Sequence, residues 1–104
     1  MTRTIPSFRG VPIRLTDERW THIVEEHCEL AGLRDEVLEV VGEPEKVLSG
    51  RAGELLALRP LDKRRFLFVV YRESSSDDGF IITAFVTTRL ASLQRREQVW
   101  PPRT

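Results

Sequence analysis

The residues of this chain that are best suited to proton transfer are its two histidines. His22 and His27 lie within the stretch RWTHIVEEHCEL, residues 19–30. An ordinary pKa near 6.5 makes histidine a natural general acid or base at neutral pH. On one continuous helix the two imidazoles would lie about 140° apart, so they could not hold a metal ion together as an i, i+4 pair does. We therefore predict no metal site and no cofactor, and we treat the two histidines as separate candidates.

The expected position of His27 leaves two interpretations open. On a helical wheel it falls on the apolar stripe with Trp20 and Ile23, so it could be a hydrogen-bonded core residue. The alternative is a catalytic acid or base at the helix end, facing the sheet edge, where water and substrate could reach it. His22 falls on the opposite side and is by default a solvated surface residue. Cys28 follows His27 directly, but neighbours on a helix point apart, so a cysteine–histidine nucleophile is not expected.

Candidate phosphate ligands lie on the later strands. Tyr71 and Arg72 end one strand, and Thr83 and Arg89 fall on one face of the next. Hydroxyl and guanidinium groups on an open sheet face suit an anionic phosphodiester. A solvent-facing antiparallel sheet is the alternative, because threonine and arginine are common there. Arg65, in the turn before the first of these strands, has the same two interpretations.

Length and composition indicate one globular domain. The chain has 104 residues, of which 40% are hydrophobic and 31% charged. We expect a single domain over residues 1–104, with a core from about residue 13 to 100. No apolar run approaches the roughly 20 residues of a membrane span, and the N-terminus lacks the apolar segment of a secretory signal. One cysteine, Cys28, excludes an intramolecular disulfide. We therefore predict a cytoplasmic protein with no membrane association.

The net charge of zero hides an uneven distribution. Residues 17–45 carry ten acids and two bases, whereas the rest of the chain carries fourteen bases and six acids. The basic part could hold an anion, although exposed charge that only serves solvation is an equally good interpretation.

The pattern of apolar residues predicts two helices followed by strands. Thr16 is a good N-cap for a helix that runs to about Glu29, and a second helix is expected over residues 33–42. Strands are expected over residues 45–50, 54–61, 64–73 and 80–90, and the tail is expected to be a short helix or an edge strand that ends at Trp100. Short connections favour antiparallel pairing. The predicted fold class is α+β, with two N-terminal helices packed on one face of a four-stranded antiparallel sheet.

A family resemblance extends from about Ile13 to Trp100. It is carried by LTDERWTHIVEEHCEL, GEPEKVLSG, ELLALRPL, RRFLFVVYRE and DGFIITAFVTTRL with a closing VW. These segments resemble the phage-associated nuclease-like domains grouped with barnase, EndoU, colicin E5/D and RelE (the BECR group), and within them the second phage-type subfamily. The most specific parts are the R-W-x-H-I-x-x-x-H helix and the I-T-A-F strand. Cys28 departs from the family, where proline is usual.

The resemblance implies a RelE-like fold and metal-independent RNA cleavage, often by toxins or within phage polyproteins. It implies RNA as the ligand and an antitoxin or immunity protein as a partner. His22 and His27 match the histidine motif and Thr83 matches the hydroxyl of the late strand. Tyr71, Arg72 and Arg89 are weaker matches, because those strand positions vary within the family.

RNA cleavage by the 2′-hydroxyl needs a base, an acid and cations for the phosphate. We predict that His27 is the acid or base, that Arg72 and Arg89 hold the phosphate, and that Thr83 and Tyr71 orient it. The competing hypothesis is a non-catalytic interaction module of the same fold. Such a module would form a homodimer or bind a partner through its sheet face, as the doubly apolar strand FLFVVY would permit.

Overall fold

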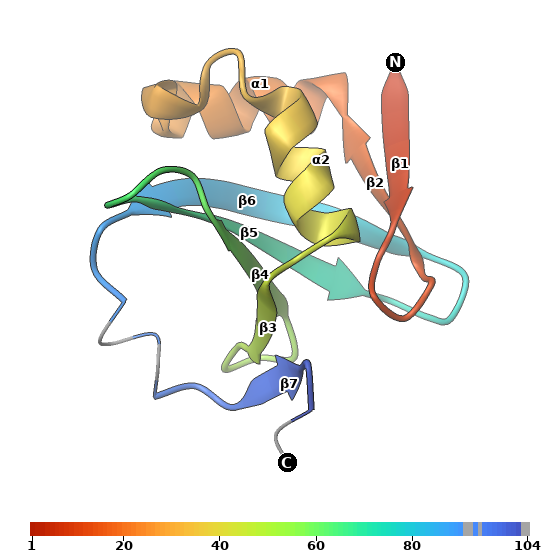
Figure 1. Ribbon diagram of the computed structural model, residues 1–104. Coiled ribbons are helices and arrows are strands. Elements are labelled where there is room, and N and C mark those ends of the chain that lie inside the picture. Colours follow the sequence, from red (N-terminus) through yellow and green to blue (C-terminus); the bar gives the residue numbers. More distant parts are fainter. Residues whose placement is uncertain (91–92, 94, 103–104) are drawn as a thin grey trace.

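The computed structural model describes residues 1–90, 93 and 95–102, and it is a mostly-sheet α+β fold (Figure 1). Its elements, in chain order, are β1 (Thr2–Pro6), β2 (Pro12–Thr16), α1 (Asp17–Glu26), the 3-10 helix η1 (Cys28–Leu30), α2 (Arg34–Gly42), β3 (Lys46–Ser49), β4 (Leu55–Pro60), β5 (Phe66–Glu73), β6 (Gly79–Thr87) and β7 (Gln98–Trp100). Within the described residues, neither α-helix has the length and apolar character needed to cross a membrane.

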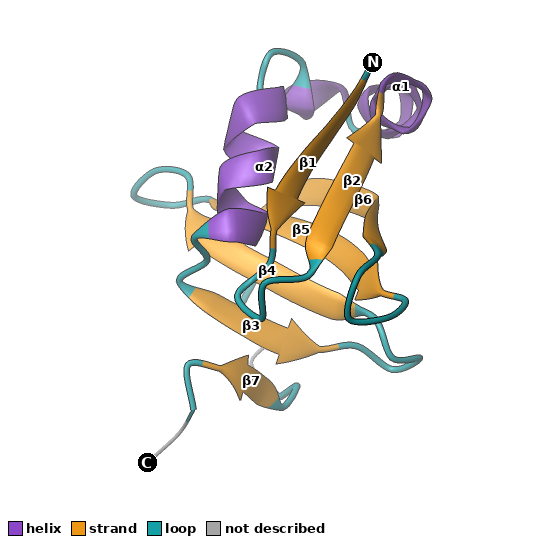
Figure 2. Cartoon of the chain, turned by 90° about the vertical axis from the view of Figure 1, so that its right-hand side faces the viewer, coloured by secondary structure: helices purple, strands orange, loops and turns teal. Residues whose placement is uncertain are grey.

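The predicted fold class is wrong, because the described residues form a sheet of seven strands that is mixed. The strand order is β1-β2-β6-β5-β4-β3-β7, and β2 runs parallel to β6. The N-terminal hairpin of β1 and β2 was not anticipated. Its first strand, TRTIP, has three polar residues and is exposed at four of five positions, so it lacks the apolar alternation by which a strand is recognised. Figure 2 shows the two strands of this hairpin in front of β5 and β6.

Most of the individual segments were predicted correctly. Thr16 is the N-cap of α1, and its hydroxyl accepts a hydrogen bond from the backbone nitrogen of Arg19. The strands β3, β4, β5 and β6 pair antiparallel with their neighbours in the chain. β5 lies fourth of seven in the sheet, in agreement with its apolar character on both faces.

The two faces of the sheet carry two separate apolar clusters. One face packs under the helices and supplies Leu67, Val69 and Tyr71 of β5 to the larger cluster. The opposite face, called here the second face, supplies the smaller cluster: Leu48, Leu56, Leu58 and Phe68, with Phe66, Val70, Phe85, Leu90 and Leu93 packed against them. The segment between β6 and β7 therefore contacts this face, which the sequence had suggested would stay open.

Side chains of β6 alternate between the two faces of the sheet, and this alternation shifts by one residue at a single position. Val70 pairs with Thr83 and Tyr71 pairs with Ile81, so Ile82 has no partner across the ladder and forms a bulge. As a result Ile81 and Ala84 both belong to the helix-side cluster. A strict two-residue period would have put them on opposite faces.

Candidate active site

The position of α1 is set by the parallel pairing of β2 with β6. Ile13 pairs with Gly79 and Arg14 pairs with Phe80, and no further pairs are formed between these two strands. A β-carbon at Gly79 would lie 2.5 Å from Cδ1 of Ile13 and 2.6 Å from the carbonyl oxygen of Arg72, so only glycine allows this approach. α1 begins where β2 ends, and it consequently lies beside β6 and contacts that strand (Figure 1).

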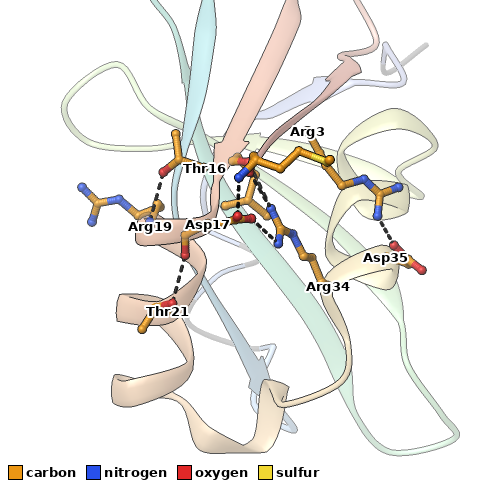
Figure 3. A network of polar contacts seen from close by, with 9 residues as sticks. Arg3, Thr16, Asp17, Arg19, Thr21, Arg34 and Asp35 are labelled. Carbon is orange, nitrogen blue, oxygen red and sulfur yellow. Dashed lines mark hydrogen bonds and ion pairs between the residues drawn. The ribbon is translucent and has the colours of Figure 1, made fainter.

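A network of polar contacts holds the start of α1 (Figure 3). Asp17 forms an ion pair with Arg34 of α2 at 2.7 Å and another with the amino group of Met1. Arg34 also donates to the carbonyl oxygen of Leu15 in β2 at 3.4 Å. Hydrogen bonds from the amino group and from Arg34 hold the pKa of the Asp17 carboxyl below its usual range. The network thus ties α1, α2 and β2 together at one point.

The helix ends earlier than expected, and this changes the direction of His27. α1 stops at Glu26, and His27 is its C-cap with φ −132° and ψ 73°, which is not a helical conformation. The angle of a helical wheel therefore does not apply to His27. The imidazole lies near the ring of Phe85 on β6, with the two ring centroids 6.5 Å apart. The aromatic ring of Phe85 therefore flanks the imidazole on one side.

A hollow of about 310 Å³ lies between α1 and β6. Both histidines and Thr83 line it, so three of the four predicted catalytic residues meet at one place. The full lining is Arg19, His22, Ile23, Glu26, His27, Ile82 and Thr83. Ile82 and Thr83 are the bulge residue and its successor, and bulges are common next to active sites because they change the direction of a side chain.

The surroundings of the two imidazoles differ. Both nitrogens of His22 have a carboxylate near them, Nε2 at 3.9 Å from Glu18 and Nδ1 at 3.7 Å from Glu25. His27 has one such neighbour, with Nδ1 at 4.0 Å from Glu29, and no described acid lies within 4.0 Å of its Nε2. The side chain of His27 is 31% exposed and that of His22 is 57% exposed. His27 therefore has the better shielded side chain, and its Nε2 has no described carboxylate beside it.

Arg19 and Glu26 were not among the predicted site residues. Together with His22 they occur at positions i, i+3 and i+7, which share one face of a helix. This spacing was visible in the sequence and would have identified them. Within the hollow Arg19 is the residue that can neutralise a phosphate, and Glu26 is a carboxylate that can accept a proton.

Tyr71 lies away from the hollow, in the core beneath the helices. Its side chain is fully buried and its hydroxyl has no hydrogen-bond partner among the described residues. Burial raises the pKa of this hydroxyl far above its usual range, the Glu73 carboxylate raises it further, and Arg9 opposes the effect. Such a group has no contact with solvent through which to meet a substrate.

The three predicted phosphate-binding arginines do not meet at one site: Arg65 and Arg89 lie just beyond the paired residues Phe66 and Thr87, whereas Arg72 lies at the other end of the same strand pair. Arg72 donates a hydrogen bond of 2.8 Å to the carbonyl oxygen of Ala52 in the turn before β4. Arg89 is exposed just beyond the end of β6. Arg65 forms an ion pair of 2.7 Å with Asp62 in the turn before β5. None of them lines the hollow that holds the histidines.

No family model, curated protein or solved structure matches this chain.

Proposed function

We propose that the protein is a metal-independent ribonuclease whose active site is the hollow between α1 and β6. The observation that carries this proposal is that His27, His22 and Thr83 line one space together with Arg19. Two proton-transfer groups, a hydroxyl and a guanidinium are a sufficient set for attack of a 2′-hydroxyl on the adjacent phosphate. The resemblance to BECR nucleases in the histidine stretch and the late strand supports the same reaction class.

The proposed reaction has one acid and one base. Glu26, or His22 in its neutral form, takes the proton of the 2′-hydroxyl, and the 2′-oxygen attacks phosphorus. Protonated His27 gives its proton to the departing 5′-oxygen as the bond between phosphorus and that oxygen breaks. The products are a 2′,3′-cyclic phosphate and a 5′-hydroxyl end. Arg19 holds the charged phosphate oxygens, and the hydroxyl of Thr83 donates a hydrogen bond to one of them.

The buried Tyr71 has no part in this scheme. Its neutral, fully enclosed hydroxyl cannot reach a phosphate without opening the core. Arg72, Arg89 and Arg65 lie outside the hollow, so any contact that they make with RNA is with phosphates distant from the bond that breaks.

The test uses purified protein, single-stranded RNA and an excess of EDTA. The expected result is cleavage that EDTA leaves unchanged, with cyclic phosphate and 5′-hydroxyl ends on the products. An RNA with one 2′-deoxynucleotide should resist cleavage at that position, since the attacking group is missing. Intact RNA under all conditions, or cleavage at the 2′-deoxy position, would overturn the proposed mechanism.

The proposal extends to a toxin-like role with an antitoxin or immunity protein as the partner and the cytoplasm as the compartment. Expression of the wild-type chain alone should then arrest bacterial growth, and co-expression of the partner should restore it. The alternative of a self-associating module has less support. Among the described residues Met1 is the one large apolar side chain that is exposed, and the second face is in part covered by Leu90 and Leu93.

A further inference from the structure

A second hollow, of about 380 Å³, lies at the opposite end of the sheet from the N-terminal hairpin. It is lined by Ser49, Gly50, Arg51, Arg95 and Arg96, at the end of β3 and before β7. We name it the arginine hollow. Arg72 reaches the same turn, because it donates a hydrogen bond to the carbonyl oxygen of Ala52. Its size is within the range of small-molecule sites, which is about 300–1,000 Å³.

The arginines here lack ion-pair partners. Within the described part of the chain, no carboxylate oxygen lies within 4.0 Å of a nitrogen of Arg51, Arg95 or Arg96. The nearby carboxylate of Glu54 accepts a hydrogen bond from the backbone nitrogen of Ala52. Chiefly this bond, and in addition the charges of Arg72 and Arg96, hold its pKa below the usual range. Glu97, whose backbone carbonyl oxygen accepts a hydrogen bond from the nitrogen of Ser49, is a second acid beside the hollow. Three arginines line the hollow and Arg72 lies next to it, so positive charge still exceeds the charge of these two acids.

The first hollow requires a positive site elsewhere if its substrate is a polyanion. Glu18, Glu25 and Glu29 lie beside the two histidines, so their charges oppose the approach of phosphates, and Arg19 is the one arginine in the lining that offsets them. Attraction of a longer RNA must therefore come from another part of the surface. Guanidinium groups suit this role, because their fork of donors matches two oxygens of one phosphate.

The sheet register relates the two hollows. Thr83 pairs with Val70, Val70 with Leu56, and Leu56 with Leu48, so these four residues form one row across the second face. Leu48 directly precedes Ser49 of the arginine hollow. Three inter-strand spacings of about 4.8 Å separate the ends of this row, roughly 14 Å along the sheet. At about 3.4 Å per stacked nucleotide this distance corresponds to roughly four nucleotides.

We infer that the arginine hollow binds phosphates of the RNA chain about four or more nucleotides away from the bond that is cleaved. This inference rests on the proposed ribonuclease function and adds a property to it. The enzyme acts on single strands long enough to occupy both hollows, and the acidic helix at the active site contributes little to affinity. Affinity for the chain then comes from Arg51, Arg95 and Arg96, whereas the histidine hollow supplies the chemistry.

The experiment measures binding separately from cleavage. The probe is a single-stranded oligonucleotide whose sugars are all 2′-O-methylated, so it cannot be cut by 2′-hydroxyl attack, in lengths of 3 to about 12 nucleotides. The test variant is Arg51→Gln with Arg95→Gln. The control is Arg3→Gln with Arg14→Gln, which removes the same charge from β1 and β2 at the other end of the sheet.

The inference predicts a length threshold and a change in salt dependence. Wild-type affinity should rise steeply once the probe exceeds about four nucleotides, and the test variant should lose this rise. The slope of log affinity against log salt should be lower by about 1.4 in magnitude, at roughly 0.7 per lost phosphate contact. Affinity at low salt should fall roughly tenfold for each arginine removed, since hydrogen bonds to charged groups are involved. The control should keep both the threshold and most of the slope.

Three outcomes would overturn the inference: equal slopes in the test and control variants, affinity that does not depend on length, or equally tight binding of a polyglutamate of matched charge. None of these would affect the proposed chemistry if the wild type still cleaves RNA. Conversely, the predicted threshold and slope in a protein that cleaves no RNA would support the arginine hollow as an RNA site and would overturn the ribonuclease function. The two failures are therefore distinguishable.

Discussion

His22 and His27 line the same hollow because α1 ends at Glu26. On a continuous helix the two side chains would point about 140° apart. The C-cap conformation of His27 breaks that geometry and directs its ring toward β6, near Phe85. The early end of the helix is thus what allows a helix residue and a cap residue to meet at one site.

Glu26 is the first residue whose role can be tested. We expect Glu26→Gln to lower kcat for RNA cleavage by about 10²-fold, because the amide cannot take a proton from the 2′-hydroxyl. The matched control is Glu39→Gln, which makes the same charge change at an exposed position of α2. Steady-state rates on one RNA substrate provide the measurement. Equal rates for Glu26→Gln and the control would indicate that His22, and not Glu26, is the base.

The contribution of the Thr83 hydroxyl to catalysis can be measured separately from that of the side chain's branched shape. Thr83→Val keeps the branched side chain and removes the hydrogen-bond donor, so we expect kcat to fall by about 10²-fold with little change in KM. Thr83→Ser keeps the hydroxyl and should retain most of the rate. A Thr83→Val protein that cleaves at the wild-type rate would show that the hydroxyl does not contact the phosphate in the transition state.

Tyr71→Phe should stabilise the protein and leave its activity intact. The substitution removes a buried hydroxyl without a described partner, so the free energy of unfolding should rise by about 1 kcal/mol. Urea denaturation of both proteins at neutral pH checks this expectation. A folded Tyr71→Phe protein without RNA cleavage would restore Tyr71 to the catalytic residues.

The burial of Tyr71 also predicts that the protein unfolds at alkaline pH. The pKa of Tyr71 is raised in the folded state, so ionisation of Tyr71 favours the unfolded state: the free energy of unfolding is unaffected by this ionisation below about pH 10 and falls as the pH rises further. Tyr71 is the one tyrosine of the chain, so tyrosinate absorbance reports it alone. We expect the absorbance to appear together with the loss of helix signal. Ionisation at pH 10 in a protein that stays folded would contradict the buried position.

The contact between Asp17 and Arg34 predicts an acid-dependent stability. The pKa of Asp17 is lowered in the folded state, so its contribution is present above about pH 4 and is lost as the pH falls through the folded-state value. Asp17→Asn should therefore lower the Tm at pH 7, and the difference from the wild type should shrink toward pH 2. A difference that does not change with pH would show that the loss does not come from the charge of Asp17.

The local features of the fold could be predicted from the sequence, whereas the long-range pairing could not. Thr16 carries its own capping signal, and the apolar residues of β5 identify a central strand. β1 is polar on both faces, so it does not stand out from a loop. The parallel contact of β2 with β6 depends on two residue pairs between segments more than sixty residues apart, and nothing local to either segment indicates it.

For the candidate site, too, the residue types could be predicted from the sequence, but their arrangement in space could not. The chemical character of His22, His27 and Thr83 was sufficient to select them. The direction of each side chain was not predictable where an element ends or bulges, as at His27 and Ile82. Tyr71 was selected for its hydroxyl, but whether a strand residue faces the core or a ligand depends on packing that one sequence does not reveal.

The rate of RNA cleavage by His27→Ala, compared with wild type and with Cys28→Ala, tests the central claim most directly. Cys28 is exposed and adjacent, so its substitution controls for disturbance of the helix end. With all three proteins folded and EDTA present, the account predicts that His27→Ala is slower by about 10²–10⁴-fold and that Cys28→Ala matches the wild type. Equal rates for His27→Ala and the wild type, or no cleavage by the wild type, would contradict it.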